Sequence, residues 1–282
     1  MSPEDSPQWK QALALMEGPI WPLVELVKML YLAGGYQDID LLFSQLPDPI
    51  EMEHATYNNP VERLAPYKEI ISAFFSANDL DVTIKDEMGE ILDPLMAKES
   101  LLRQKIIEQE LETINSLLCT PMGCDLCCIG PTPQEKNLFF EIPISEEELD
   151  LFQVEKISTD ASRSSLSAHE PPLKIGGKEF YRCGPCVIEW MSGHSLILPR
   201  GARCPQLNDN GRCIIYDERP KTCRKPQIFA YVVEKDSKLG NFTFRNKMLA
   251  ILDCPYVKIL KNKIHLYASL CNLDLVVSPN RK

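Results

Sequence analysis

Residues 119–128 read CTPMGCDLCC, and residues 204–224 read CPQLNDNGRCIIYDERPKTCR. The first stretch spaces four cysteines as C-x4-C-x2-C-C, and the second stretch adds three more. Thiols at such close spacing oxidise, exchange and bind metal ions, so a chain that gathers them seldom uses them only for packing. The two stretches therefore predict a domain built around a metal–thiolate centre.

Seven cysteines form the predicted ligand pool of this centre. A two-residue gap, as between Cys124 and Cys127, lets both sulfurs face one ion, and Gly123 allows the backbone to bend before them. Neighbouring side chains diverge, so Cys128 is expected to be either a further ligand or a redox partner. The candidate ligands are Cys119, Cys124, Cys127, Cys128, Cys204, Cys213 and Cys223.

The second stretch is expected to supply the ligands that the first stretch lacks. The turn at residues 208–211 would bring Cys204 and Cys213 together. Nearby basic side chains either offset the thiolate charge and lower the thiol pKa values or make only surface ion pairs, and both interpretations stay open. These basic residues are Arg219, Lys221, Arg224 and Lys225.

Zinc and an iron–sulfur cluster both accept four thiolates. The adjacent Cys127 and Cys128 and the surplus of thiols favour an iron–sulfur cluster as the cofactor, with zinc as the alternative. Whether such a metal is catalytic or structural cannot be read from the ligands alone.

Composition places the chain among cytoplasmic proteins. Its 282 residues carry a formal net charge of -10, which argues against a nucleic-acid partner. Three charges and two prolines interrupt the most apolar early run, residues 11–33, and Glu4 and Asp5 stand where a signal peptide needs positive charge. We therefore expect neither a membrane partner nor structural disulfides, since clustered cysteines in a reducing cytosol are metal-binding or catalytic.

Charge and cysteine content both change near residue 118. Residues 1–118 hold 21 acidic and 8 basic residues, whereas residues 119–282 hold 19 acidic and 22 basic residues and all eleven cysteines. This predicts two domains, an acidic helical domain at 1–118 and a cysteine-cluster metal-binding domain at 119–282. The acidic face is either simply solvated or a docking surface for a basic protein partner.

The hydrophobic pattern predicts an α+β fold, with an N-terminal helical bundle followed by a small mixed α/β cysteine-rich domain. Helical spacing is clearest in residues 99–118. Ser145 and Glu148 form a capping-box signal for a helix after the first predicted strand, and the residues at 158–172 read as a polar loop. The other predicted elements are helices at 8–33, 61–78 and 256–266, a strand at 137–144, a hairpin at 174–182 and an antiparallel pair at 227–233 and 241–245.

The cysteine pattern resembles that of the YkgJ-type cysteine-cluster family, also called the CxxCxxCC family. In both, the first cysteines are followed by C-P-x-L, a short turn and C-x-I-Y-x-x-R-P. The signature runs from Cys204 through Arg224, and the segment IPISEEELDLF lies where that family has a strand and helix. The first cysteine gap is four residues here, where the family name indicates two, and Lys225-Pro226 replaces an aromatic residue before a proline. The resemblance covers residues 115–260 and implies a zinc- or iron-chelating protein.

The same resemblance implies an alternative, enzymatic function. The motif is similar to the cysteine cluster of flagellin lysine methylases, which use S-adenosylmethionine with a metal centre. Methyl transfer to protein lysine is therefore the alternative hypothesis, although the sequence has no glycine-rich G-x-G-x-x-G loop.

The remaining cysteines and two histidines have weaker signals. Cys183-Gly184-Pro185-Cys186 is either an additional metal knuckle or a redox pair. His169 and His194 are more typical of solvent-facing or hydrogen-bonded histidines than of ligands. Cys254 is a candidate late ligand, and Cys271 is predicted to pack in a core.

Overall fold

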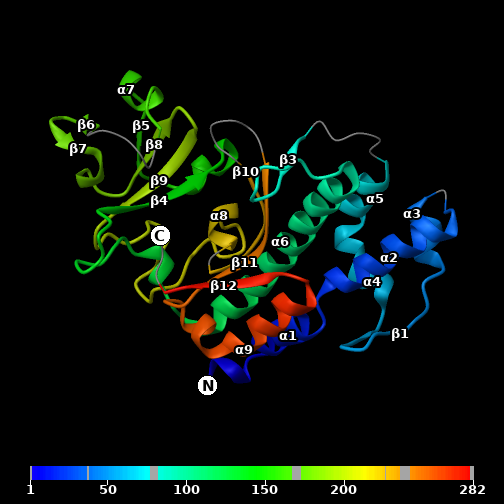
Figure 1. Ribbon diagram of the computed structural model, residues 1–282. Helices are drawn as coiled ribbons and strands as arrows, with labels where there is room; N and C mark the ends of the chain where they lie inside the picture. Colours follow the sequence, from blue (N-terminus) through cyan, green and yellow to red (C-terminus); the bar gives the residue numbers. More distant parts are fainter. Residues whose placement is uncertain are drawn as a thin grey trace. The chain divides into compact units, whose positions relative to one another are not determined.

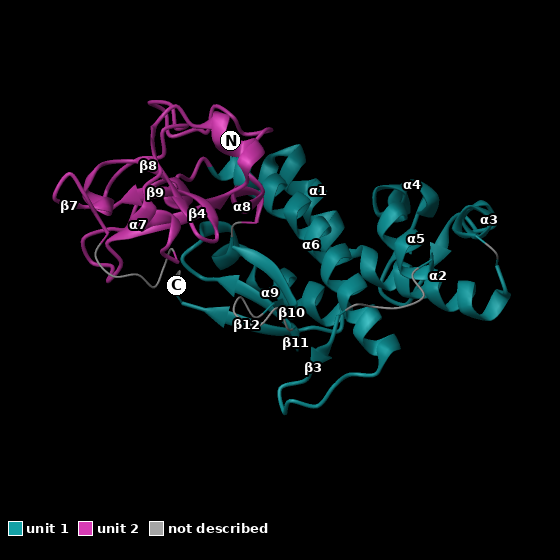
Figure 2. Ribbon diagram, turned by 90° about the horizontal axis from the view of Figure 1, so that it is seen from above, with its two compact units in different colours: residues 1–122, 227–282 teal, residues 123–226 magenta. Residues whose placement is uncertain are grey.

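The computed structural model describes residues 2–36, 38–76, 82–166, 173–225, 227–235 and 242–279, and the fold is α+β with helices at its N-terminus (Figure 1). The chain forms two compact units, with residues 1–122 and 227–282 in unit 1 and residues 123–226 in unit 2 (Figure 2). This division differs from the predicted domains at 1–118 and 119–282. The difference arises because the C-terminal segment packs with the N-terminal helices.

Most helices of unit 1 overlap the predicted ranges, but the range 8–33 forms two helices, the helix predicted at 99–118 already starts at residue 94, and the helix at 39–44 was not predicted. The longest, α6, buries Ile106, Leu111 and Leu118 on one face, as the helical spacing of its apolar residues requires. It continues four residues beyond the predicted end at 118, and Gly123 follows with a φ of 58°. The helices are α1 (Pro7–Glu17), α2 (Ile20–Gly34), α3 (Ile39–Ser44), α4 (Pro60–Leu64), α5 (Lys68–Ser76), α6 (Pro94–Met122) and α9 (Pro255–Leu270).

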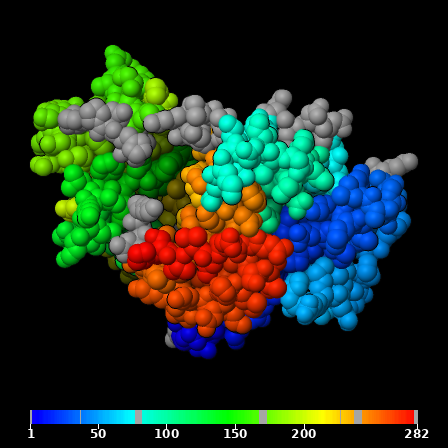
Figure 3. Space-filling view, viewed as in Figure 1, coloured from blue at the N-terminus to red at the C-terminus, as the bar shows by residue number. Residues whose placement is uncertain are grey.

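Unit 1 also contains a sheet that the prediction of a purely helical first domain missed. Strand β11 pairs antiparallel with β10, as predicted, and parallel with both β12 and β3. Helix α9 packs against α1, so N-terminal and C-terminal segments share one surface (Figure 3). The strands are β3 (Ile84–Lys85), β10 (Ile228–Lys235), β11 (Phe242–Ile251) and β12 (Asp274–Ser278), and β1 (Ile50–Glu51) pairs separately with β2 (Thr56–Tyr57).

Polar side chains of α6 tie this helix to the sheet. The register of β10 and β11 shifts between Tyr231 and Val233, and Gln104 Oε1 accepts the Val232 N–H at 2.8 Å there. Asn115 donates to the Ile228 carbonyl at 2.7 Å. Because buried backbone groups need partners, these two side chains fix where α6 lies on β10.

The core of unit 1 encloses a carboxyl group. Glu110 of α6 is 1% exposed, and its Oε1 accepts the Ile20 N–H at 2.9 Å. Tyr267 of α9 donates its hydroxyl to Glu110 Oε2 at 2.7 Å. The first N–H groups of a helix lack intrahelical partners, so Glu110 completes the start of α2. Burial raises the pKa of Glu110 to about 7.

Unit 2 is a four-stranded sheet in the order β4-β9-β8-β5, in which only β5 runs parallel to its neighbour. Its two faces carry separate cores, because successive residues of β8 point to opposite sides. The predicted hairpin is present, with Gly176 and Gly177 at φ values of 56° and 82°. The strands are β4 (Phe139–Ile144), β5 (Glu155–Ile157), β6 (Lys174–Ile175), β7 (Lys178–Glu179), β8 (Cys186–Trp190) and β9 (Gly193–Pro199).

Two predicted segments of unit 2 differ in detail. The capping box is present, since Ser145 N–H donates to Glu148 Oε2 at 2.8 Å, but the turn that it starts is a 3-10 helix, η4 (Glu146–Leu151). The predicted loop at 158–172 contains the short helix α7 (Asp160–Arg163), and its residues 167–172 lie outside the described residues. The further short helices are η1 (Pro3–Asp5), η2 (Ala65–Tyr67), η3 (Leu126–Cys128), η6 (Phe180–Arg182) and α8 (Lys221–Arg224).

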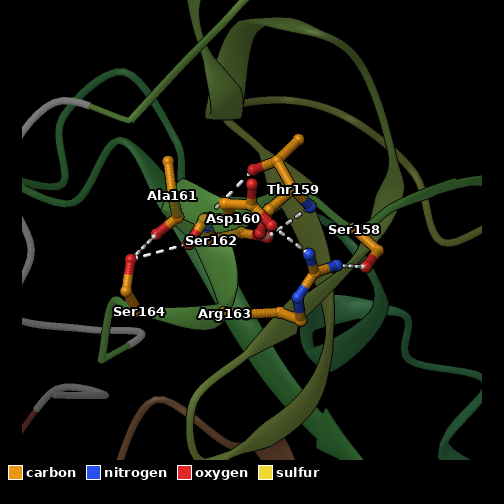
Figure 4. A network of polar contacts seen from close by, with 7 residues as sticks. All are labelled: Ser158, Thr159, Asp160, Ala161, Ser162, Arg163 and Ser164. Carbon is orange, nitrogen blue, oxygen red and sulfur yellow. Dashed lines mark hydrogen bonds and ion pairs between the residues drawn. The ribbon is translucent and has the colours of Figure 1, made fainter.

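Helix α7 is stabilised by local side chains that accept hydrogen bonds from backbone N–H groups at its start (Figure 4). Thr159 Oγ1 accepts the Ser162 N–H, and Ser162 Oγ accepts the Thr159 N–H, both at 3.0 Å. Arg163 bonds to Ser158 and Asp160 beside them. Serine and threonine compete for backbone groups in this way wherever they start a turn.

Among the residues that the structure describes, no helix has both the length and the apolar character to cross a membrane.

Candidate metal centre

Two loops of unit 2 meet beside the sheet and bring the two cysteine stretches together. Ile129 and Arg203 form an antiparallel bridge, and the Cys204 N–H donates to the Cys128 carbonyl at 2.7 Å. The Gly130 N–H donates to the Ala202 carbonyl at 2.8 Å. These backbone bonds place Cys128 and Cys204 next to one another, although 76 residues separate them in the sequence.

Gly130 makes this crossing possible. A Cβ atom at this position would lie 1.8 Å from the Pro199 carbonyl oxygen, which ends β9. No residue other than glycine fits at such a separation. The sequence contains a signal for this position, a glycine two residues after the cysteine pair, but sequence reasoning did not single it out.

The second loop turns where the sequence predicted a turn. Asn208 Oδ1 accepts the Asn210 and Arg212 N–H groups at 3.0 and 2.9 Å, and Gly211 has a φ of 73°. The Leu207–Cys213 bridge then closes the loop, so that Cys213 returns toward Cys204. The predicted juxtaposition of these two cysteines is confirmed.

Cys223 is held by a stacked arginine. The Arg219 guanidinium lies 3.6 Å from the centroid of the Tyr216 ring, and its Nε donates to the Tyr216 carbonyl at 2.7 Å. The Cys223 N–H donates to the Pro220 carbonyl at 2.8 Å and starts the turn of α8. Arg219 is buried, so its cation–π contact with Tyr216 is an internal contact of the segment YDERPKTC.

The thiols of the loops interact with one another. The pKa of Cys128 is raised, and burial is the largest cause. The next causes are the neighbouring thiols of Cys204, Cys127, Cys223 and Cys213, in that order. Burial also raises the pKa of Cys223 to about 12, again with thiols as neighbours. Because thiolates repel one another and burial penalises their charge, the group is unfavourable as free thiolates.

Of the two open interpretations of the basic residues, charge compensation at a thiol is seen for Arg219, although the net direction of the pKa shift at Cys223 is upward. Arg219 does act to lower the pKa of Cys223, but burial and the neighbouring thiols outweigh it. The pKa of Cys204 is also raised, first by burial.

The structure separates the seven candidate ligands into three sets. Five belong to unit 2 and are linked by electrostatic effects on the pKa values of Cys128 and Cys223, namely Cys127, Cys128, Cys204, Cys213 and Cys223. Cys124 also belongs to unit 2 and is partly buried, three residues before Cys127. Cys119 belongs to unit 1, where it lies in the last turns of α6 and packs against the core. The assignment of all seven as ligands stays a prediction.

The other singled-out residues lie elsewhere. Cys254 precedes the first turn of α9 and Cys271 follows its last turn, and both are buried in the core of unit 1, which confirms the packing prediction for Cys271. His194 is partly buried in β9, and His169 lies outside the described residues.

Part of the chain is similar to a known domain family, CxxCxxCC. Residues 118–248 match the model of this family, which is described as a "Putative zinc- or iron-chelating domain". The match begins in α6, covers all of unit 2 and ends in β11. The predicted resemblance is thereby confirmed over these residues, and it supports metal binding. Comparison with curated proteins and with solved structures gave no match.

The donor set of unit 2 fits such a metal. The five thiols are the soft ligands that zinc and iron–sulfur clusters take, and all of them are partly buried. Within the described ranges, no three His, Cys, Asp or Glu side chains already converge at the geometry of a bound ion. Binding of one ion by three or more of these thiols would therefore require them to come closer together than they lie here.

Proposed function

We propose that the protein binds an iron–sulfur cluster through thiolates drawn from Cys127, Cys128, Cys204, Cys213 and Cys223. The observation that carries this proposal is the gathering of these five partly buried thiols, whose charges act on one another. Zinc and an iron–sulfur cluster both take four thiolates, and we favour the cluster because Cys127 and Cys128 are adjacent and thiols are in surplus. The family description names iron as well as zinc.

Electrostatics supports a cationic occupant. Thiols with raised pKa values stay protonated near neutral pH, whereas a bound metal stabilises the thiolates and releases their protons. The Arg219 guanidinium, whose Nη1 lies 3.5 Å from the Cys223 carbonyl oxygen, adds positive charge beside one of the ligands. An iron–sulfur cluster held in this way supplies one-electron transfer.

Anaerobic purification followed by metal analysis and a visible absorbance spectrum tests the proposal. We expect iron and acid-labile sulfide with the broad visible absorbance of thiolate-bound iron. A colourless protein with stoichiometric zinc would replace the cluster with a zinc site, and protein free of both metals would reject the thiolate centre.

Single substitutions test the ligand pool. Cys128→Ser, Cys213→Ser and Cys223→Ser should each reduce the metal content per chain, because each removes a thiol of the group. Cys271→Ala is the matched control, since it removes a buried thiol from the core of unit 1. Full metal content in all three serine variants would contradict the proposed ligands.

The predicted basic partner and the alternative of methyl transfer stay predictions. The structure reduces the charge argument for the partner, because residues 227–282 add nine basic and four acidic residues to unit 1 and bring its net charge from -13 to -8. Lys263 pairs with Glu17 at 2.6 Å, and Lys247 pairs with Glu87 at 2.7 Å.

A further inference from the structure

A second pair of cysteines in unit 2 lies outside the proposed ligand pool, in the sequence Cys183-Gly184-Pro185-Cys186. Cys183 ends η6, where its N–H donates to the Phe180 carbonyl at 3.2 Å, and its side chain is partly buried. Cys186 is fully buried and begins β8. A tight turn thus joins a more accessible thiol to a buried one.

The turn between them is conformationally special. Gly184 has a φ of 92°, which only glycine adopts without strain, and the ring of Pro185 restricts the next φ to about −65°. Cys186 is then anchored on both sides, because it is the register partner of Glu155 in β5 and of Ile197 in β9. A buried thiol fixed in the sheet therefore follows, three residues later in the chain, a partly buried thiol on a short and constrained loop.

Electrostatics distinguishes this pair from the metal centre. After burial, the groups that raise the pKa of Cys186 are the thiol of Cys183 and the carboxylate of Glu155. The groups that act on Cys128 are instead the other four thiols of the metal centre. Cys183 thus acts on Cys186, and the thiols that act on Cys128 are a different set.

We propose that Cys183 and Cys186 form a reversible disulfide, which gives unit 2 a dithiol redox site in addition to its metal centre. The oxidant is a small-molecule disulfide such as glutathione disulfide. The Cys183 thiolate attacks one of its sulfurs, forms a mixed disulfide and releases one glutathione thiolate. The Cys186 thiolate then attacks the Cys183 sulfur and expels the second glutathione. The protein loses two electrons and two protons, and the oxidant becomes two glutathione molecules.

The burial of Cys186 determines how fast this site exchanges. Burial raises the pKa of Cys186 to about 12, so its thiolate is scarce as an attacking group and poor as a leaving group. We expect the bridge to close and reopen more slowly than an exposed dithiol does, and to persist once it has formed.

Tryptic peptide mapping reads this bridge directly. Cleavage after Arg182 and Arg200 releases residues 183–200, a peptide that contains Cys183 and Cys186 and no other cysteine. The metal-loaded protein is incubated with glutathione disulfide, alkylated and digested. We expect the wild-type peptide to lose both alkylation sites and two hydrogen atoms, and to regain both sites after dithiothreitol.

Two variants separate the steps. Cys186→Ala should accumulate a glutathione adduct on Cys183, whereas Cys183→Ser should stay unmodified because Cys186 is buried. Both thiols of the wild-type peptide staying alkylatable would overturn the proposal, as would a bridge to a different cysteine peptide. Metal content is measured on the same samples, and its loss in both variants would assign the pair to the metal centre instead. If the bridge forms and the metal is retained, the disulfide proposal is supported whichever metal the protein holds. The identity of the metal tests the iron–sulfur assignment separately.

Discussion

The buried carboxyl of Glu110 predicts an unusual pH dependence of stability. Its pKa is raised by burial from an ordinary 4.5 to about 7 in the folded protein, although the Tyr267 hydroxyl and the Ile20 N–H oppose this. Between these two pH values the folded state binds more protons than the unfolded state. The stabilisation by the protonated carboxyl is therefore complete below pH 4.5 and is lost as the pH rises through about 7.

The magnitude follows from the two pKa values. A change from 4.5 to about 7 corresponds to about 3 kcal/mol in the free energy of unfolding, at about 1.4 kcal/mol for each pH unit. No discount for solvent screening applies, because the side chain is 1% exposed. Other carboxyl groups with lowered pKa values act in the opposite direction, so the effect of Glu110 must be isolated by substitution.

Glu110→Gln isolates it, because glutamine resembles the protonated carboxyl and cannot ionise. Urea unfolding of both proteins at a series of pH values from 5 to 8 gives the difference in their free energies of unfolding. We expect the variant to gain stability relative to the wild type as the pH rises, by about 3 kcal/mol over the full range. A difference that stays constant with pH would refute a carboxyl that titrates near neutrality, and with it the reading of Glu110 as a proton-binding core group.

Three further outcomes are expected. Gly130→Ala should destabilise unit 2 by roughly 3 kcal/mol or more and lower the metal content, because the new Cβ would lie 1.8 Å from the Pro199 oxygen. Urea unfolding and metal analysis measure the two effects, and a variant with unchanged stability and metal content would contradict the close approach of the two loops. Asn115→Ala should cost about 3 kcal/mol, since it removes the bonds that Asn115 makes to the Ile228 carbonyl and to the Tyr256 hydroxyl. Tyr256→Phe, which removes one of these two bonds, should have the smaller effect in the same unfolding assay. Removal of the metal by a chelator should increase hydrogen exchange in the two cysteine loops and leave hydrogen exchange in α6 unchanged, because we expect the metal to hold the loops together. Equal protection of the loops with and without the metal would argue against this expectation.

Much of the fold followed from local patterns. The apolar stripe of α6, the hairpin at Gly176 and Gly177 and the antiparallel pair β10–β11 are properties of short segments, so their residue types suffice to predict them. The capping box also formed as predicted, although its turn stayed 3-10. Local signals fail where a distant segment decides, and the allocation of residues 227–282 to unit 1 is the clearest case.

The candidate site divides in the same way. Spacing alone identified the cysteines, and the Asn208–Gly211 turn predicted that Cys213 returns toward Cys204. No local pattern could show that Cys119 packs in the core of unit 1 rather than in unit 2, since it stands in the same cysteine run.

The sequence by itself determined the chemistry of this protein, because clustered thiols can serve few purposes and their spacing is a local property. Only the tertiary structure decided which thiols become neighbours and in which direction their pKa values move. Both depend on contacts between segments far apart in the chain, such as the Cys128–Cys204 backbone bond, and on the burial that those contacts create. Loop closure and desolvation depend on contacts between distant segments, and the local periodicity of a sequence does not predict such contacts.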